Sequence, residues 1–147
     1  EILEKLKIEL PVKLKLHPRT KKKDKFNKVI SNSKLKINVE KKQSSETLIK
    51  KSKLVIGMNS AILFQAALVG KPVISYQPNL KGLDPLISNR LRVSKAVYKK
   101  EDLYQAIKQA LSEGPQKNNF QRIKKYINKN SVGKVITLIN KIINGAI

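Results

Sequence analysis

The sequence contains no cysteine and no tryptophan, and it has a single histidine. Without cysteine the chain has no disulfide and offers no thiolate to a metal. One histidine excludes a metal site built from several histidines. No Asp-x-Asp sequence is present, which argues against a divalent metal held by that motif. We therefore expect no metal and no resident cofactor.

Long apolar runs are also missing. None approaches the ~20 residues that an α-helix needs to cross a bilayer. The first residues, Glu-Ile-Leu-Glu-Lys, lack the basic segment and the apolar stretch of a secretory signal. We expect a cytoplasmic location. Because the chain begins without methionine, we also expect a fragment of a longer protein.

Acidic residues are scarce, since 10 Asp and Glu stand against 32 Lys and Arg and leave a net charge of +22. Lysines that neutralise phosphates release counterions, so this charge favours anionic partners. However, the lysines are spread along the chain, four basic residues are arginine, and no aromatic-basic pattern of an RNA-binding motif appears. We expect no specific nucleic-acid partner. A solvated lysine-rich surface and attraction to an anionic membrane or acidic polymer both stay open.

The 147 residues suffice for one domain, and short apolar strands alternate with helical segments along them. Strands are expected at 12–16, 35–39, 54–56, 73–76 and 96–98, and helices at 26–30, 44–51, 61–69, 86–91, 101–112, 120–128 and 132–143. This order predicts an α/β fold: a Rossmann-like, three-layer domain with a parallel sheet of about five strands, closed by C-terminal helices. The expected divisions are a linker or helix end at 1–11, the Rossmann-like domain at 12–118 and the closing helices at 119–147.

A Gly-Met-Asn-Ser turn at residues 57–60 joins a predicted strand to a predicted helix. In parallel sheets, ligands bind beyond the carboxyl ends of the strands. Gly57 allows a ligand to approach the backbone closely, and the helix start offers free amides and a positive dipole end. The turn therefore suits a phosphate. Asn59 or Ser60 either caps the helix, donates to a phosphate oxygen, or does both.

The sequence His17-Pro18-Arg19 follows the first predicted strand. If that strand lies beside the one that ends at Gly57, His17 and Arg19 can add charge-assisted hydrogen bonds to the same anion. The plain alternatives are a turn histidine and a surface arginine. Joint placement at one sheet edge favours the binding site.

The segments "KLHPR" and "SKLVIGMNSAILFQAALVGKPVISYQP" resemble the C-terminal half of GT-B glycosyltransferases of bacterial surface-polysaccharide synthesis. The similar group spans bacterial sialyltransferases and polysialyltransferases, the glycerophosphotransferases of teichoic-acid synthesis and the UDP-N-acetylglucosamine 2-epimerases. The resemblance runs from Val12 to Leu111 and is strongest between Leu54 and Pro78. It implies that residues 12–118 form a donor-binding domain for a nucleotide-sugar.

The resemblance also implies roles for single residues. In the sialyltransferases an H-P motif and a serine-containing motif grip the phosphate and cytidine of the donor, and His17 with Pro18 matches the first and Ser60 the second. Many relatives bind the ribose hydroxyls with an acidic residue on the helix. Here that position is Gln65, an amide that can still hydrogen-bond a diol.

A second polar group follows the fourth predicted strand. Tyr76 and Gln77 are candidates for the base pocket or the acceptor cleft. Asp84 and Arg90, in the stretch that resembles the sialyltransferase-like branch, lie near the expected cleft, where ordinary loop charges are the favoured interpretation.

The resemblance implies a glycosyltransferase whose catalytic residue lies in an N-terminal domain outside this sequence, so we expect this half alone to be inactive. The expected substrate is a CMP-, UDP- or CDP-linked sugar, and the acceptor is a glycan or a lipid-linked glycan. Two alternatives stay open: a nucleotide-sugar epimerase or CDP-glycerol glycerophosphotransferase-like domain, and a non-catalytic basic module that docks on an anionic membrane or polymer. The basic surface fits a peripheral position at the inner membrane face.

Overall fold

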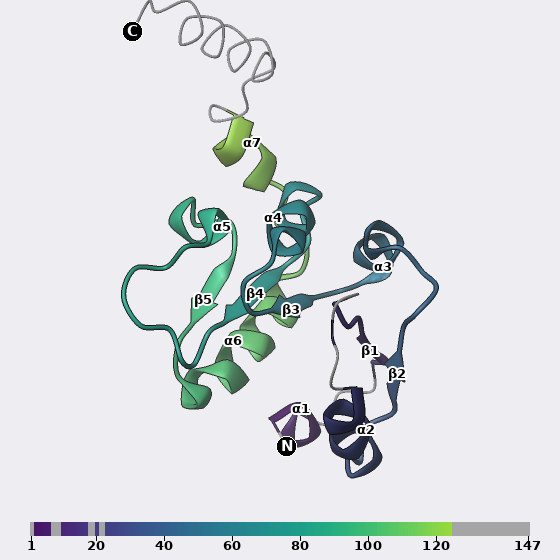
Figure 1. Ribbon diagram of the computed structural model, residues 1–147. Coiled ribbons are helices and arrows are strands. Elements are labelled where there is room, and N and C mark those ends of the chain that lie inside the picture. Colours follow the sequence, from purple (N-terminus) through teal and green to yellow (C-terminus); the bar gives the residue numbers. More distant parts are fainter. Residues whose placement is uncertain (1, 7–9, 18–19, 21–22, 125–147) are drawn as a thin grey trace, which may run out of the picture.

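A computed structural model describes residues 2–6, 10–17, 20 and 23–124 of the chain (Figure 1). Its strands are β1 (Val12–Leu14), β2 (Ile37–Val39), β3 (Val55–Gly57), β4 (Val73–Tyr76) and β5 (Lys95–Val97). Its helices are α1 (Ile2–Lys5), α2 (Lys23–Ser31), α3 (Ser45–Lys51), α4 (Ala61–Leu68), α5 (Ile87–Arg90), α6 (Lys100–Glu113) and α7 (Asn119–Lys124). Helices and strands alternate from α1 to α6, so the prediction of an α/β fold is confirmed.

All strand pairs are parallel, as predicted, but the five strands form two sheets. One contains β1 and β2, and the other has the order β3-β4-β5. The expectation of one continuous sheet was therefore wrong. The physical reason lies in the sequence of β1 and β2, where exposed polar residues alternate with half-buried apolar ones. A strand inside a parallel sheet that helices cover on both faces must be apolar on both faces.

The three-stranded sheet forms the middle layer of a three-layer arrangement (Figure 1). On one face, α4 contributes Leu63, Ala66 and Ala67 to a core that also holds Val73 of β4 and Ile123 of α7. On the other face, α6 contributes the second core. Its buried members are Ile74, Val97, Leu103, Ala106 and Ile107, and Ile2, Leu3 and Leu6 pack against them. Consecutive residues of β4 thus point into opposite cores, as the pleat requires.

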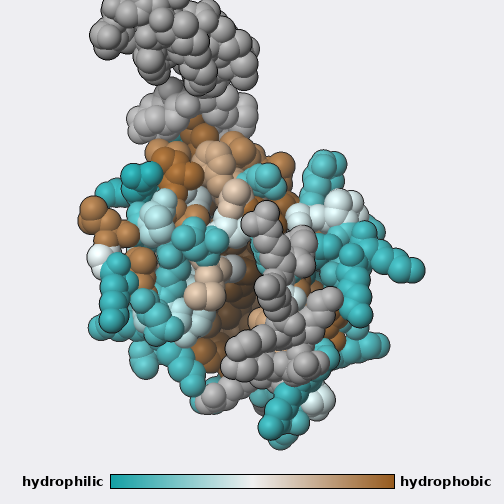
Figure 2. Space-filling view, in the orientation of Figure 1, coloured by the Kyte–Doolittle hydropathy of each residue, from teal (hydrophilic) through white to brown (hydrophobic). Residues whose placement is uncertain are grey.

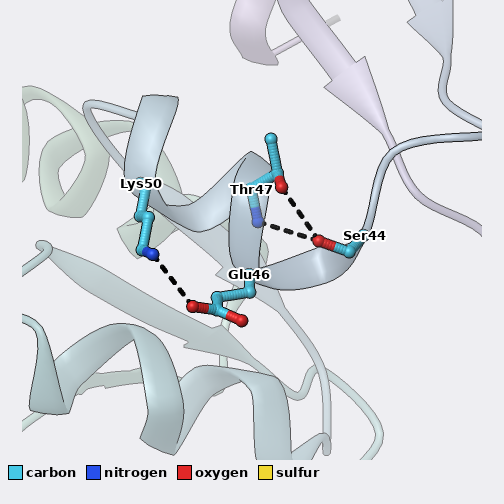
Figure 3. A network of polar contacts seen from close by, with 4 residues as sticks. All are labelled: Ser44, Glu46, Thr47 and Lys50. Atoms are coloured by element: carbon cyan, nitrogen blue, oxygen red, sulfur yellow. Dashed lines mark hydrogen bonds and ion pairs between the residues drawn. The ribbon is translucent and has the colours of Figure 1, made fainter.

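Helix α3 begins where the sequence predicts it. The Ser44 side chain accepts a hydrogen bond from the Thr47 amide at 3.1 Å and satisfies one of the free amides of the first turn (Figure 3). One turn later, the Glu46 carboxylate lies 2.9 Å from the Lys50 ammonium. Both side chains are exposed to solvent, which screens their charges, so this ion pair contributes little to stability.

Helix α4 also matches its predicted bounds. Ser60 is its N-cap, and the chain leaves the helix through Gly70, whose φ of 75° lies in the left-handed region that favours glycine. The next residue, Lys71, donates to the Lys50 carbonyl at 2.7 Å. This contact links the end of α4 to the end of α3.

Strand β3 is an edge strand of its sheet, and its Ile56 side chain is 40% exposed. The predicted helix at 132–143 lies outside the described residues, as does the end of the one predicted at 120–128. The proposed divisions after residues 11 and 118 stay predictions. Among the helices described, none combines the length and the apolar character that a membrane span requires.

Candidate functional site at the carboxyl ends of the strands

The turn between β3 and α4 begins with a glycine in a tight place. A Cβ atom built on Gly57 would lie 3.0 Å from Cδ2 of Leu63, whose side chain is 1% exposed. The backbone therefore rests directly on the core under the first turn of α4. This close packing fixes where the helix begins.

Ser60 completes the turn. Its side chain accepts a hydrogen bond from the Ile62 amide at 3.3 Å, so its role as helix cap is confirmed. A hydroxyl that accepts in this way keeps its own proton for another partner. Asn59 is exposed beside it, and Gln65 is exposed further along α4. The roles of these three side chains toward a ligand stay predictions.

The segment after β1 is described in part. His17 is exposed, and its carbonyl accepts a hydrogen bond from the Thr20 amide at 2.9 Å. Pro18 and Arg19 lie outside the described residues. Because β1 and β3 belong to different sheets, this segment and the β3–α4 turn do not follow hydrogen-bonded neighbouring strands. Their joint action on one ligand stays a prediction.

A chain of hydrogen bonds connects the β3–α4 turn to β4 and to the loop that follows it. The fully buried Ser75 donates from Oγ to the Met58 carbonyl at 3.0 Å. Gln77, which is 5% exposed, donates from Nε2 to Ser75 Oγ at 2.9 Å and to Asp84 Oδ2 at 3.1 Å. The turn and the loop are therefore held in one arrangement.

Asp84 is the centre of this network. Its Oδ2 accepts from Asn89 Nδ2 at 2.6 Å and from the Tyr98 hydroxyl at 2.7 Å, in addition to Gln77. Its Oδ1 accepts from the Leu86 amide at 2.8 Å. Burial raises the pKa of Asp84, but the hydrogen bonds together lower it by a larger amount. The resulting pKa is about 2. The carboxylate is ionised at neutral pH and ties together the segments that follow β4 and β5.

The sequence interpretation missed this role of Asp84. The one local signal was the aspartate itself, because an aspartate in a loop often accepts a hydrogen bond from the main-chain amide two residues later, as in an Asx turn. The partners Asn89 and Tyr98, by contrast, lie 5 and 14 residues further along the chain, and no regular spacing indicates them. Arg90 is exposed and is absent from the network just described.

Tyr76 lies on the other face of the sheet. It is half-buried and lines a pocket of about 400 Å³ that also borders Leu3, Ile37 and Lys100. Gln77 points into the Asp84 network instead. The two residues that the sequence placed together are therefore in different surroundings.

The hydrogen bond to Asp84 raises the pKa of Tyr98 above its ordinary value, with burial and the carboxylate charge acting in the same direction. We expect Tyr98→Phe to remove a high-pH component from the ultraviolet titration of the tyrosines. Loss of this exposed hydrogen bond should cost about 1 kcal/mol of the free energy of unfolding. The variant Tyr104→Phe is the control and should keep that component. An unchanged titration in Tyr98→Phe would contradict the described contact.

Fold and site together define an α/β domain with parallel strands and a polar network at their carboxyl ends. No family model, curated protein or solved structure matches the chain. Over the described part of the chain, no group of three or more His, Cys, Asp or Glu side chains is placed to hold a metal ion.

Proposed function

We propose that the chain is the nucleotide-sugar-binding domain of a GT-B-type glycosyltransferase and that the β3–α4 turn binds the donor phosphate. The observation that carries this proposal is the position of the Ser60 cap, directly beyond the carboxyl end of a parallel strand. Ligands of α/β sheets bind in that place. The free amides and the dipole of a helix start suit a phosphate.

The hydrogen bonds of the turn support this role. The Met58 carbonyl is engaged by Ser75. A carbonyl oxygen that is fixed on β4 is not directed at an incoming anion, which it would repel. Ser60 keeps a hydroxyl proton that it can donate to a phosphate oxygen.

In the proposed reaction this domain binds the donor and stabilises the charge that develops on the departing nucleotide phosphate. Inverting transfer also needs a general base that deprotonates the acceptor hydroxyl. We assign that group to an N-terminal domain outside this sequence. The proposed acceptor is a glycan or a lipid-linked glycan. Binding of a nucleotide without turnover is therefore the expected behaviour of this chain.

The prediction is tested by calorimetric titration with CMP, CDP, UDP and GDP at low and high salt. We expect one nucleotide to bind at least about tenfold more tightly than the others, which is about 1.4 kcal/mol. Ser60→Ala removes one donor to a charged oxygen and should weaken that binding by roughly tenfold. A preference for CMP would indicate sialyl transfer, one for CDP a glycerophosphotransferase, and one for UDP a hexose transferase or an epimerase.

Ser44→Ala is the matched control, because it removes the N-cap hydroxyl of α3 (Figure 3) and leaves the β3–α4 turn intact. This variant should lose as much helix capping as Ser60→Ala loses, but it should keep the nucleotide affinity. The proposal would be overturned if all four nucleotides bound equally weakly, if high salt abolished this binding, and if Ser60→Ala left it unchanged. That result would favour the alternative of a basic docking module.

A further inference from the structure

The two-stranded sheet has one lysine face. Lys13 lies opposite Asn38 in the parallel register, so the two side chains share a face. Lys15 and Lys36 lie just beyond the ends of β1 and β2, where the alternation of exposed and half-buried residues continues and places them on the same side. All four residues are exposed, whereas Val12, Leu14, Ile37 and Val39 of the other face are half-buried. In α/β proteins, both faces of a parallel sheet are usually covered by helices. This face bears charge instead.

The charges of the lysine face act together. Residues two apart on a strand are separated by about 7 Å and neighbouring strands by about 5 Å. These spacings are shorter than the Debye length of about 8 Å at physiological ionic strength. The Lys15 ammonium is also held in place, since it donates to the Gln43 carbonyl at 2.7 Å.

The neighbouring surface is basic as well. Residues 10–17 and 34–53 contain nine lysines, all exposed, and two acids, Glu40 and Glu46. Glu46 is paired with Lys50. Glu40 accepts hydrogen bonds from the amides of Lys42 and Gln43, and the charges of Lys13 and Lys15 also lower its pKa, so one carboxylate lies near the lysine face. Figure 2 shows hydrophilic side chains gathered over α3 and β2. The excess of positive charge is therefore concentrated on this side of the molecule.

We propose that the lysine face (Lys13, Lys15 and Lys36) docks on an anionic phospholipid bilayer. Parallel lysine side chains on one sheet face can reach a single plane of lipid phosphates, and each is a compact point charge that needs no fixed partner geometry. A nucleic acid is the less suitable partner, because the face carries no arginine fork and no aromatic ring for stacking on a base. This inference does not rest on nucleotide binding.

The test is sedimentation with vesicles of phosphatidylcholine that contain about 30 mol% phosphatidylglycerol, at about 0.15 M salt. We expect the protein to bind these vesicles and to ignore pure phosphatidylcholine. The triple variant Lys13→Gln/Lys15→Gln/Lys36→Gln should partition roughly 100-fold more weakly, since each lysine near an anionic surface is worth about fivefold. Circular dichroism checks the fold of each variant.

Lys81→Gln/Lys108→Gln/Lys117→Gln is the matched control, because it removes the same charge from three exposed lysines elsewhere. It should retain most of the vesicle binding, and the charge-preserving variant Lys13→Arg/Lys15→Arg/Lys36→Arg should retain it too. Equal losses in the two glutamine variants would overturn the proposal in favour of diffuse attraction. Failure to bind anionic vesicles would also overturn it. So would a first glutamine variant that binds duplex DNA more weakly than the natural chain does but binds the vesicles equally well.

Discussion

Asp84→Ala is expected to lower the free energy of unfolding by about 3 kcal/mol. The substitution removes the acceptor shared by Gln77, Asn89 and Tyr98. Gln77 is buried, so its amide group would lose one of its two partners out of reach of bulk water. Urea unfolding followed by circular dichroism measures the loss. Asp102→Ala, on the exposed first turn of α6, is the control and should cost a few tenths to about 1 kcal/mol.

The same carboxylate predicts a pH dependence. The pKa of Asp84 is about 2 in the folded protein, below its ordinary value of 3.8. The ionised form therefore stabilises the fold fully above pH ~4, and this contribution is lost as the pH falls through the folded pKa. The difference in the free energy of unfolding between the natural chain and Asp84→Asn should shrink as the pH falls from ~4 to ~2. A difference that stays constant from neutral pH down to pH ~2 would contradict the assignment.

Leu63→Ala should cost about 3 kcal/mol, because Leu63 is 1% exposed and its loss leaves a cavity between α4 and the sheet. Gly57→Ala alone should cost about 1 kcal/mol, since the new methyl group meets Leu63 Cδ2 at 3.0 Å. In the Leu63→Ala background that atom is gone. The double variant should therefore be about 1 kcal/mol more stable than the sum of the two losses predicts.

Ile107→Ala is the control for this cycle. Ile107 is equally buried but belongs to the core on the α6 face. Ile107→Ala should lower the free energy of unfolding about as much as Leu63→Ala does. The losses caused by Ile107→Ala and Gly57→Ala should simply add. If the stability losses of the Leu63 and Gly57 substitutions also simply added, that result would contradict the close contact under the β3–α4 turn.

Much of the secondary structure could be predicted because its signals are local. The caps Ser44 and Ser60 and the glycine at position 70 mark helix ends within a few residues. The apolar run of β4 gave its bounds, 73–76, directly. Periods of two and of 3.6 residues likewise separated the alternating strands from α6.

The division into two sheets and the Asp84 network could not be read in this way. Which strand pairs with which depends on how side chains pack over both faces, and β1 and β3 are separated by two helices and a strand. The network joins Met58, Gln77, Asp84 and Tyr98, which are spread over some forty positions. Its donors are ordinary polar residues until the fold brings them to one carboxylate.

The parallel register has a consequence for how the chain is made. Val12 pairs with Ile37, Val55 with Val73, and Ile74 with Lys95, so within the described residues each strand pairs only with a strand next to it in sequence. None of these pairings has to close a loop that spans most of the chain. During synthesis, each strand–helix–strand unit can close as soon as its second strand has left the ribosome, without waiting for the remainder of the chain. The order of the elements along the sequence is then also the order of their assembly.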